Sequence, residues 1–183
     1  MRLLIAVMTM VSLIAGCASQ PENLDLASSA TAPKTMIVEQ SLSGKLQGDG
    51  VFINSLTGGE TKFSVLMDGT WDGKKLTLVE DFTFADGSQE RKTWVLTKVA
   101  EGVYEGTRED VIGIADVRQD GPNVRLDYYV TLHTDIGGID VRFRDIMYVN
   151  ADGTITNKAV VSKFGLRVGR VEITMRPLGK PGA

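Results

Sequence analysis

Residues 124–133 read Val-Arg-Leu-Asp-Tyr-Tyr-Val-Thr-Leu-His, and this stretch decides the fold class. Apolar side chains hold every second position in it, and mostly polar ones stand between them. Because successive side chains of a β-strand point to opposite faces, this period of two predicts a strand with one buried face. The same alternation runs through 76–84 and 170–176, and no segment after the first sixteen residues carries an apolar stripe of helical period. The chain is therefore predicted to be all-β.

Short turn motifs separate these strands at regular intervals. They are Gly58-Gly59, Asp72-Gly73, Asp86-Gly87, Glu101-Gly102, Asp120-Gly121, Gly137-Gly138 and Asp152-Gly153. Asp-Gly and Gly-Gly favour the positive-φ turns that join antiparallel strands, so the pattern predicts a meander. A meander of about 8 to 10 strands can close on itself and remove its edges, which predicts an up-and-down barrel. A barrel of that size has room for one small ligand.

The N-terminus has the pattern of a secretory signal peptide over residues 1–16. Arg2 is followed by an apolar run from Leu3 to Ile14, which is shorter than the roughly 20 residues that cross a bilayer as a helix. Ile14-Ala15-Gly16 precedes Cys17 and resembles the bacterial lipobox, so Cys17 is expected to be lipidated and to anchor the chain to a membrane. The alternative is a plain cleavage site followed by a free thiol.

Residues 17–42 are expected to form the lipidated cysteine and a flexible tether, and residues 43–183 the barrel domain. The tether is rich in Ser, Ala, Thr and Pro and has too few large apolar side chains to offset the entropy of ordering. Within it, Met36–Ser43 has an alternative interpretation as one turn of helix that closes an end of the barrel.

The composition argues against several classes of function. Lys and Arg number 20 against 23 Asp and Glu, so there is no basic field to hold a nucleic acid. His133 is the only histidine and Cys17 the only cysteine, which excludes internal disulfides and leaves no His/Cys metal site or Ser-His-Asp set. We expect no metal and no cofactor. A carboxyl pair such as Glu80 with Asp145 leaves acid–base catalysis open, although the sequence favours a protein that is not an enzyme.

Several short motifs resemble the bacterial lipoproteins catalogued as domain of unknown function 3833. The resemblance runs from about Leu42 to Pro177 and rests on Trp71-Asp72-Gly73, Glu80-Asp81-Phe82, Tyr104-Glu105-Gly106, Met147-Tyr148 and, most specifically, Ser162-Lys163-Phe164-Gly165. It implies a lipocalin-like barrel on a lipid anchor in the cell envelope, without an assigned activity or ligand. One departure is Arg144-Asp145-Ile146, where the family pattern has an acid pair and a tryptophan.

This resemblance also carries an expectation about location. Ala18 follows Cys17, and no aspartate stands there to signal retention in the inner membrane. The chain is therefore expected at the outer membrane, facing the periplasm.

Polar side chains interrupt apolar faces of the predicted strands at four positions. They are Glu80, Asp116, Asp145 and Asn157. If those faces line the interior, each carboxylate needs a partner there, because an isolated buried charge is costly. The cations considered for this role are Arg91, Arg142, Arg144 and Lys163.

These positions have two interpretations. In the first they are structural, at strand ends, bulges or in an ion-pair network, and in the second they form a polar floor that orients the head of an amphipathic ligand. Trp94 and Tyr128 are further candidates for lining a pocket, although aromatic side chains in strands commonly serve packing.

Two functions fit these observations. The first is an envelope lipoprotein whose barrel binds or shuttles a small amphipathic or hydrophobic ligand such as a lipid or fatty acid. The second is an accessory lipoprotein with a packed barrel that docks an unidentified envelope protein. The volume of the lumen separates them, because a ligand pocket needs about 300 Å³ or more.

Overall fold

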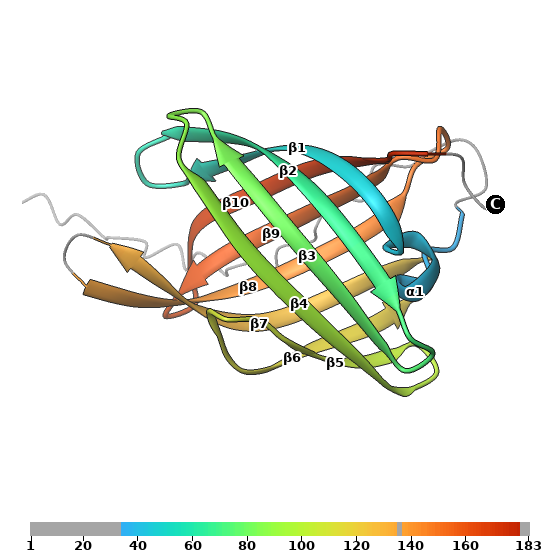
Figure 1. The fold of residues 1–183 in the computed structure, drawn as a ribbon. Coiled ribbons are helices and arrows are strands. Elements are labelled where there is room, and N and C mark those ends of the chain that lie inside the picture. The colour runs from blue at the N-terminus through green and yellow to red at the C-terminus, as the bar shows by residue number, and fades with distance from the viewer. Residues whose placement is uncertain (1–33, 135–136, 180–183) are drawn as a thin grey trace, which may run out of the picture.

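A computed structural model describes residues 34–134 and 137–179, and these form a closed barrel of ten antiparallel strands (Figure 1). The up-and-down barrel of 8 to 10 strands predicted from the alternation and the turns is confirmed, and it agrees with the lipocalin-like barrel that the family resemblance implies. The strands are β1 (Gly44–Asn54), β2 (Glu60–Trp71), β3 (Lys75–Phe84), β4 (Gln89–Ala100), β5 (Val103–Thr107), β6 (Val111–Asp120), β7 (Asn123–Thr134), β8 (Gly137–Val149), β9 (Ile155–Lys163) and β10 (Leu166–Pro177). The predicted signal peptide, Cys17 and most of the predicted tether lie outside the described residues.

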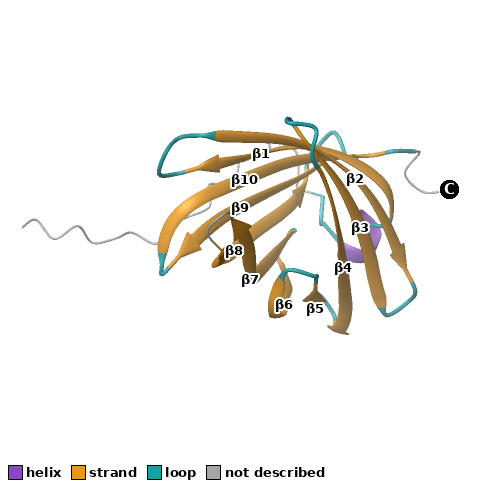
Figure 2. Cartoon of the chain, turned by 60° about the vertical axis from the view of Figure 1, so that its left-hand side comes forward, coloured by secondary structure: helices purple, strands orange, loops and turns teal. Residues whose placement is uncertain are grey.

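Every strand pairs with its neighbours in sequence, and β1 pairs with β10 to close the barrel. At this seam Leu46 lies opposite Pro177 and Asn54 opposite Gly169. Figure 2 shows the curvature that brings the first and last strands together. Closure leaves no strand edge exposed, because every strand has a partner on both sides.

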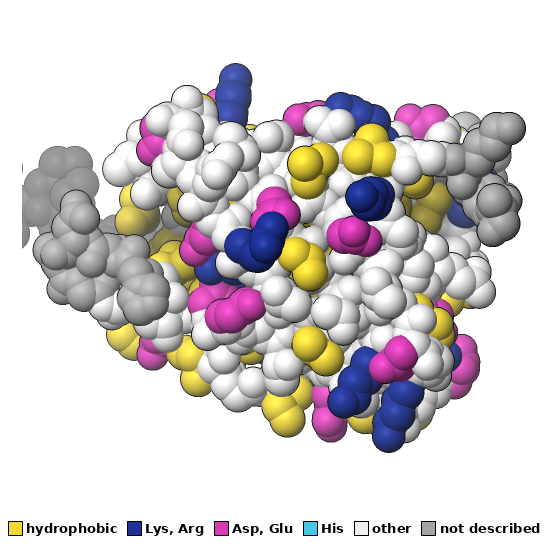
Figure 3. All heavy atoms as spheres, viewed as in Figure 1, with side chains coloured by type: hydrophobic (Ala, Val, Ile, Leu, Met, Phe, Trp, Pro, Cys, Tyr) yellow, Lys and Arg dark blue, Asp and Glu magenta, His cyan; other side chains and the backbone are white. Residues whose placement is uncertain are grey.

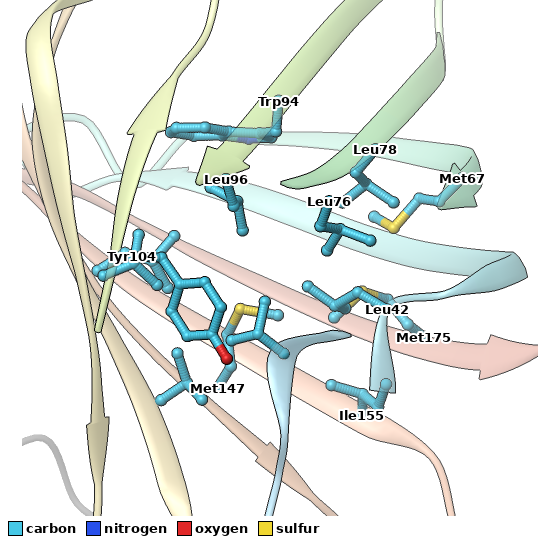
Figure 4. Close-up of a cluster of buried hydrophobic side chains, with 14 of the residues drawn as sticks. Leu42, Met67, Leu76, Leu78, Trp94, Leu96, Tyr104, Met147, Ile155 and Met175 are labelled. Atoms are coloured by element: carbon cyan, nitrogen blue, oxygen red, sulfur yellow. The ribbon is translucent and has the colours of Figure 1, made fainter. Parts of the chain in front are cut away.

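A single helical turn, α1 (Val38–Ser41), packs at one end of the barrel. Met36, Val38 and Leu42 are buried there, and Figure 4 shows Leu42 close to Leu76 and Met175. The alternative interpretation of Met36–Ser43 as a helical turn therefore describes this segment better than a flexible tether, and residues before 43 pack against the barrel.

Two contacts hold α1 in place. Glu39 accepts hydrogen bonds from Lys98 Nζ, at 2.8 Å, and from the hydroxyl of Tyr104. Gly69 leaves room for the chain, because a Cβ atom there would lie 1.8 Å from the carbonyl oxygen of Leu42. We call this end of the barrel the closed end and the opposite one the mouth.

Among the described residues, no helix has the length and apolar character that a membrane span requires.

The predicted turns fall between strands, with two differences. Gly137-Gly138 begins β8, and residues 135–136 before it lie outside the described part of the chain. Two further turns, at 108–110 and 164–165, join strands at the mouth. The second lies in the segment Lys163–Gly169, whose broken alternation predicts a loop or bulge, and β10 does have a register shift between Arg167 and Gly169.

The outer surface is polar over the face viewed in Figure 3, where hydrophobic side chains lie scattered among charged ones. Arg91 and Asp81, for example, pair across β4 and β3 at 2.5 Å, where their side chains are 69% and 45% exposed. Scattered exposed apolar side chains are normal on soluble proteins.

Candidate functional site

The barrel encloses a cavity of about 350 Å³. It extends from Leu42 and Met175 at the closed end to Phe84 and Glu90, which stand where β3 ends and β4 begins at the mouth. Glu90 is 49% exposed, so the cavity reaches solvent there. The barrel is hollow, and its lumen is large enough for a small ligand.

The closed half of the cavity is apolar. Leu42, Leu78, Leu96 and Met175 line it there, whereas Met67, Leu126, Met147 and Ile173 lie beside Glu80, Asp145 and Asn157 on neighbouring strands. Three phenylalanines stand nearer the mouth, where the ring of Phe63 lies 5.6 Å from that of Phe82 and 6.1 Å from that of Phe84. The charged and amide side chains of the lining form what we call the polar belt. They are Glu80, Glu90, Lys92, Arg108, Asp110, Asp145 and Asn157.

Alternation within three strands places three of the predicted polar residues in the belt. Glu80 of β3, Asp145 of β8 and Asn157 of β9 line the cavity, and the two carboxyl side chains are only 7% and 5% exposed. Trp94 of β4 and Tyr128 of β7 line it as well. The structure therefore brings together five of the six side chains predicted as ligand-binding candidates.

Asp116 is the sixth candidate, and its predicted inward orientation is wrong. It shares a strand face with Ile112 and Ile114, as the alternation indicates, but that face is outside, where Ile114 is 61% exposed. Ala115 and Val117 are the buried residues of this part of β6. Small side chains are enough there because the indole of Trp94 already occupies this part of the lumen. It lies so close to the wall that a Cβ atom on Gly106 would be 3.2 Å from the indole and 3.2 Å from the Cβ of Ala115. The carboxylate of Asp116 instead pairs with Arg118 at 2.7 Å.

The cations considered for the lumen are also not the ones found there. Arg91 and Arg142 pair with Asp81 and Asp127 on the outer face. Arg144 is exposed, and Lys163 lies 5.3 Å from the ring of Phe164 beside an exposed turn. The cavity is instead lined by Arg108 and Lys92.

Arg108 comes from the turn at 108–110, which the sequence pattern does not reveal. The turn is fixed by hydrogen bonds from Val111 N to Arg108 O, at 3.0 Å, and from Thr131 N to Asp110 O, at 3.1 Å. The Arg108 guanidinium donates to both carboxylate oxygens of Asp110, at 2.7 and 3.3 Å. It also lies 4.7 Å from the ring of Trp94, a favourable cation–π distance. This turn therefore carries a cation into the barrel.

Lys92 completes the charged part of the belt at the mouth. Its ammonium group lies 2.8 Å from Glu90 and 2.8 Å from Asp110. Burial opposes ionisation of Asp110, but Lys92 and Arg108 together hold the pKa of that carboxyl below its ordinary value. Both lumen cations are thus engaged mainly by Asp110 and Glu90.

Glu80 is left with a weak partner. Its nearest cation is Arg108, whose Nη1 lies 3.8 Å from Oε2, too far for a hydrogen bond. Burial raises the pKa of Glu80 to about 7, against the attraction of Arg108.

Asp145 has neutral partners among the described residues. Its Oδ2 accepts hydrogen bonds from Asn157 Nδ2, at 3.0 Å, and from the Tyr128 hydroxyl, at 3.4 Å. Burial raises its pKa to about 6, although those hydrogen bonds and the charge of Arg108 favour ionisation. The ion pair expected between Asp145 and an inward cation is therefore replaced by a hydrogen-bonded carboxyl group.

Three buried oxygens of the belt accept no hydrogen bond. They are Glu80 Oε2, Asp145 Oδ1 and Asn157 Oδ1. Buried polar atoms are normally paired, so unpaired acceptors that line a cavity mark a place where a bound group can donate. The described residues contain no group of three or more His, Cys, Asp or Glu side chains placed to hold a metal ion.

Comparison with known proteins gives a family and a fold. The family described as "Protein of unknown function (DUF3833)" matches residues 11–177, which is most of the chain. No curated protein matches the sequence.

Among solved structures, the S-type phycobiliprotein lyase CPES from Guillardia theta aligns with a TM-score of 0.55 at 9% identity, over 78% of this chain and 92% of the lyase. A redesigned β-barrel, mFAP1, bound to DFHBI aligns with a TM-score of 0.39 at 13% identity, over 75% of this chain and 96% of its own. At such identities the likeness to the lyase shows a shared barrel fold alone.

Proposed function

This chain belongs to the DUF3833 family of proteins of unknown function, and we propose that its barrel binds a small amphipathic ligand in the lumen. The observation that carries the proposal is the cavity of about 350 Å³, with an apolar closed half and a belt of partly unpaired polar atoms. Small-molecule sites combine a mostly apolar lining with a few placed polar groups. The apolar half would take the ligand's hydrocarbon part, and the belt would take its head group.

The alternative of an accessory protein with a packed barrel is less well supported. It needs a lumen filled by its own aromatic side chains, whereas the cavity exceeds the roughly 300 Å³ that a ligand pocket needs.

Filling the lumen tests this function directly. We expect Val171→Trp, at a partly buried position on the cavity wall, to weaken binding of the neutral fluorophore phenylnaphthylamine at least tenfold, since the indole would occupy the ligand's space. The matched control is Ile114→Trp, which adds the same side chain on the outer face and should leave affinity unchanged. Fluorescence titration of the full chain measures both. Equal binding by the wild type and Val171→Trp would contradict a site in the lumen.

We further propose that the protein acts in the cell envelope, anchored through lipidated Cys17 at the outer membrane and facing the periplasm. The support is the apolar run followed by Ile14-Ala15-Gly16-Cys17, and the single cysteine of the chain stands at this point. A lipid-anchored barrel can exchange a ligand with the membrane beside it.

Removal of the thiol tests the anchor. Cys17→Ala is expected to move the protein from the membrane fraction to the soluble fraction, because the acyl chains would have no attachment site. Fractionation of cells from the source organism, with immunoblotting, gives the measurement. A Cys17→Ala protein that stayed in the membrane fraction would contradict lipid anchoring.

A further inference from the structure

We propose that the head group bound in the lumen is a cationic nitrogen that donates hydrogen bonds, so that the ligand is an amphipathic amine. The proposal rests on the proposed binding function and specifies its ligand class. It starts from the three unpaired oxygens of the polar belt, Glu80 Oε2, Asp145 Oδ1 and Asn157 Oδ1. All three are acceptors, and a protonated amine brings N–H donors without adding another acceptor.

The charges around the cavity favour the same class. Among the described residues the lining contains four carboxyl side chains, Glu80, Glu90, Asp110 and Asp145, and two cations, Lys92 and Arg108. Lys92 and Arg108 are held by Glu90 and Asp110 at 2.7 to 2.8 Å. In the described part of the chain no cation lies within hydrogen-bonding distance of Glu80 or Asp145, and Arg108 is 3.8 Å from Glu80.

Glu80 and Asp145 come from opposite walls of the lumen, because β3 and β8 are five strands apart in the ring of ten. Each is almost completely buried, and the charge of Asp145 adds to the burial that disfavours ionisation of Glu80. A cation placed between two like charges relieves both the repulsion and the burial cost of each carboxylate. A carboxylate head group would instead add a third negative charge beside them.

The apolar walls account for the rest of the ligand. The cavity continues from the belt toward Leu42, Leu96 and Met175 at the closed end, where these lining side chains carry no charge. A hydrocarbon chain fits this half, with its nitrogen at the belt. The ligand proposed for the lumen is therefore a long-chain ammonium compound and not a fatty acid.

Three probes with one chain length separate the head groups: dodecylammonium, dodecanol and dodecanoate, each below its critical micelle concentration. Trp94 lines the lumen and reports binding by its fluorescence, and Trp71→Phe in the full chain makes it the only tryptophan. At neutral pH we expect dodecylammonium to bind at least tenfold more tightly than dodecanoate. Glu80→Gln and Asp145→Asn should each weaken dodecylammonium about tenfold and leave dodecanol within about threefold.

Asp81→Asn is the matched control, since Asp81 neighbours Glu80 on β3 but pairs with Arg91 on the outer face, and it should change none of the three affinities. Dodecanoate binding as tightly as dodecylammonium, or dodecylammonium binding unchanged in both lumen variants, would overturn the amine assignment while leaving a lumen site in place. If none of the three probes altered Trp94 fluorescence, both this inference and the proposed function would fail.

Discussion

Replacing Arg108 by alanine is expected to lower the free energy of unfolding by about 3 to 5 kcal/mol, which is the usual cost of removing one partner of a buried ion pair. The Arg108 side chain is 12% exposed, and Asp110, its partner, is 11% exposed. The substitution removes both hydrogen bonds to Asp110, the nearest cation to Glu80 and the cation–π contact with Trp94. Urea unfolding, followed by circular dichroism, measures the change.

Arg118→Ala provides the control. Arg118 makes a comparable ion pair with Asp116, but it is 63% exposed and should change stability by no more than about 1 kcal/mol. Arg108→Lys keeps the positive charge but replaces the planar guanidinium, which donates to both oxygens of Asp110, by an ammonium group. It should therefore restore only part of the stability that Arg108→Ala removes. A loss for Arg108→Ala as small as that for Arg118→Ala would mean that the guanidinium does not stabilise the belt.

The double variant Glu80→Gln/Asp145→Asn is expected to be more stable than the wild type at high pH. In the folded protein the pKa of Glu80 is about 7 and that of Asp145 about 6, both above their ordinary values of 4.5 and 3.8. Folding therefore favours the protonated forms, and the stability that this gives is fully present below about pH 4 and is lost as the pH rises through 6 and 7. Each rise in pKa corresponds to about 3 kcal/mol in the free energy of unfolding. The two titrations are coupled, because the charge of one carboxylate disfavours ionisation of the other.

Comparison across pH isolates this effect. The double variant should match the wild type near pH 4 and exceed its free energy of unfolding by about 3 kcal/mol or more near pH 8. Asp81→Asn removes a carboxyl whose pKa is lowered by its hydrogen bond with Arg91, so it should show no such gain at high pH. A difference between double variant and wild type that did not grow with pH would show that these carboxyl groups are not forced to ionise in a buried site.

Much of the fold is predictable from the sequence because a barrel of hairpins repeats two local signals. Alternation in residues 76–84 and 124–133 gives the inward faces of β3 and β7, and Asp-Gly or Gly-Gly pairs give most turns. The turn at 108–110 is missed because Arg-Glu-Asp contains neither glycine nor proline. Its one trace in the sequence is the interval from Glu101-Gly102 to Asp120-Gly121, the longest between predicted turns, which holds two strands.

Because the turn at 108–110 is not predicted, Arg108 is not predicted as a residue of the site either. Glu80, Asp145 and Asn157 are predictable because each interrupts a regular apolar face. Arg108 belongs to no alternating strand, so only the folded turn shows that it enters the lumen. Asp116 is misplaced for a different reason, since apolar Ile112 and Ile114 are taken as an inner face, whereas small residues suffice next to the Trp94 indole.

The seam between β1 and β10 has a consequence for how the barrel forms. Nine of its strand pairings join neighbours in sequence, but this one joins distant residues, such as Asp49 and Arg176, which are separated by 127 positions. Local hairpins form with little loss of chain entropy, whereas the distant pairing requires closure of a long loop before any contact repays it. We therefore expect the nine local pairings to form before β1 pairs with β10.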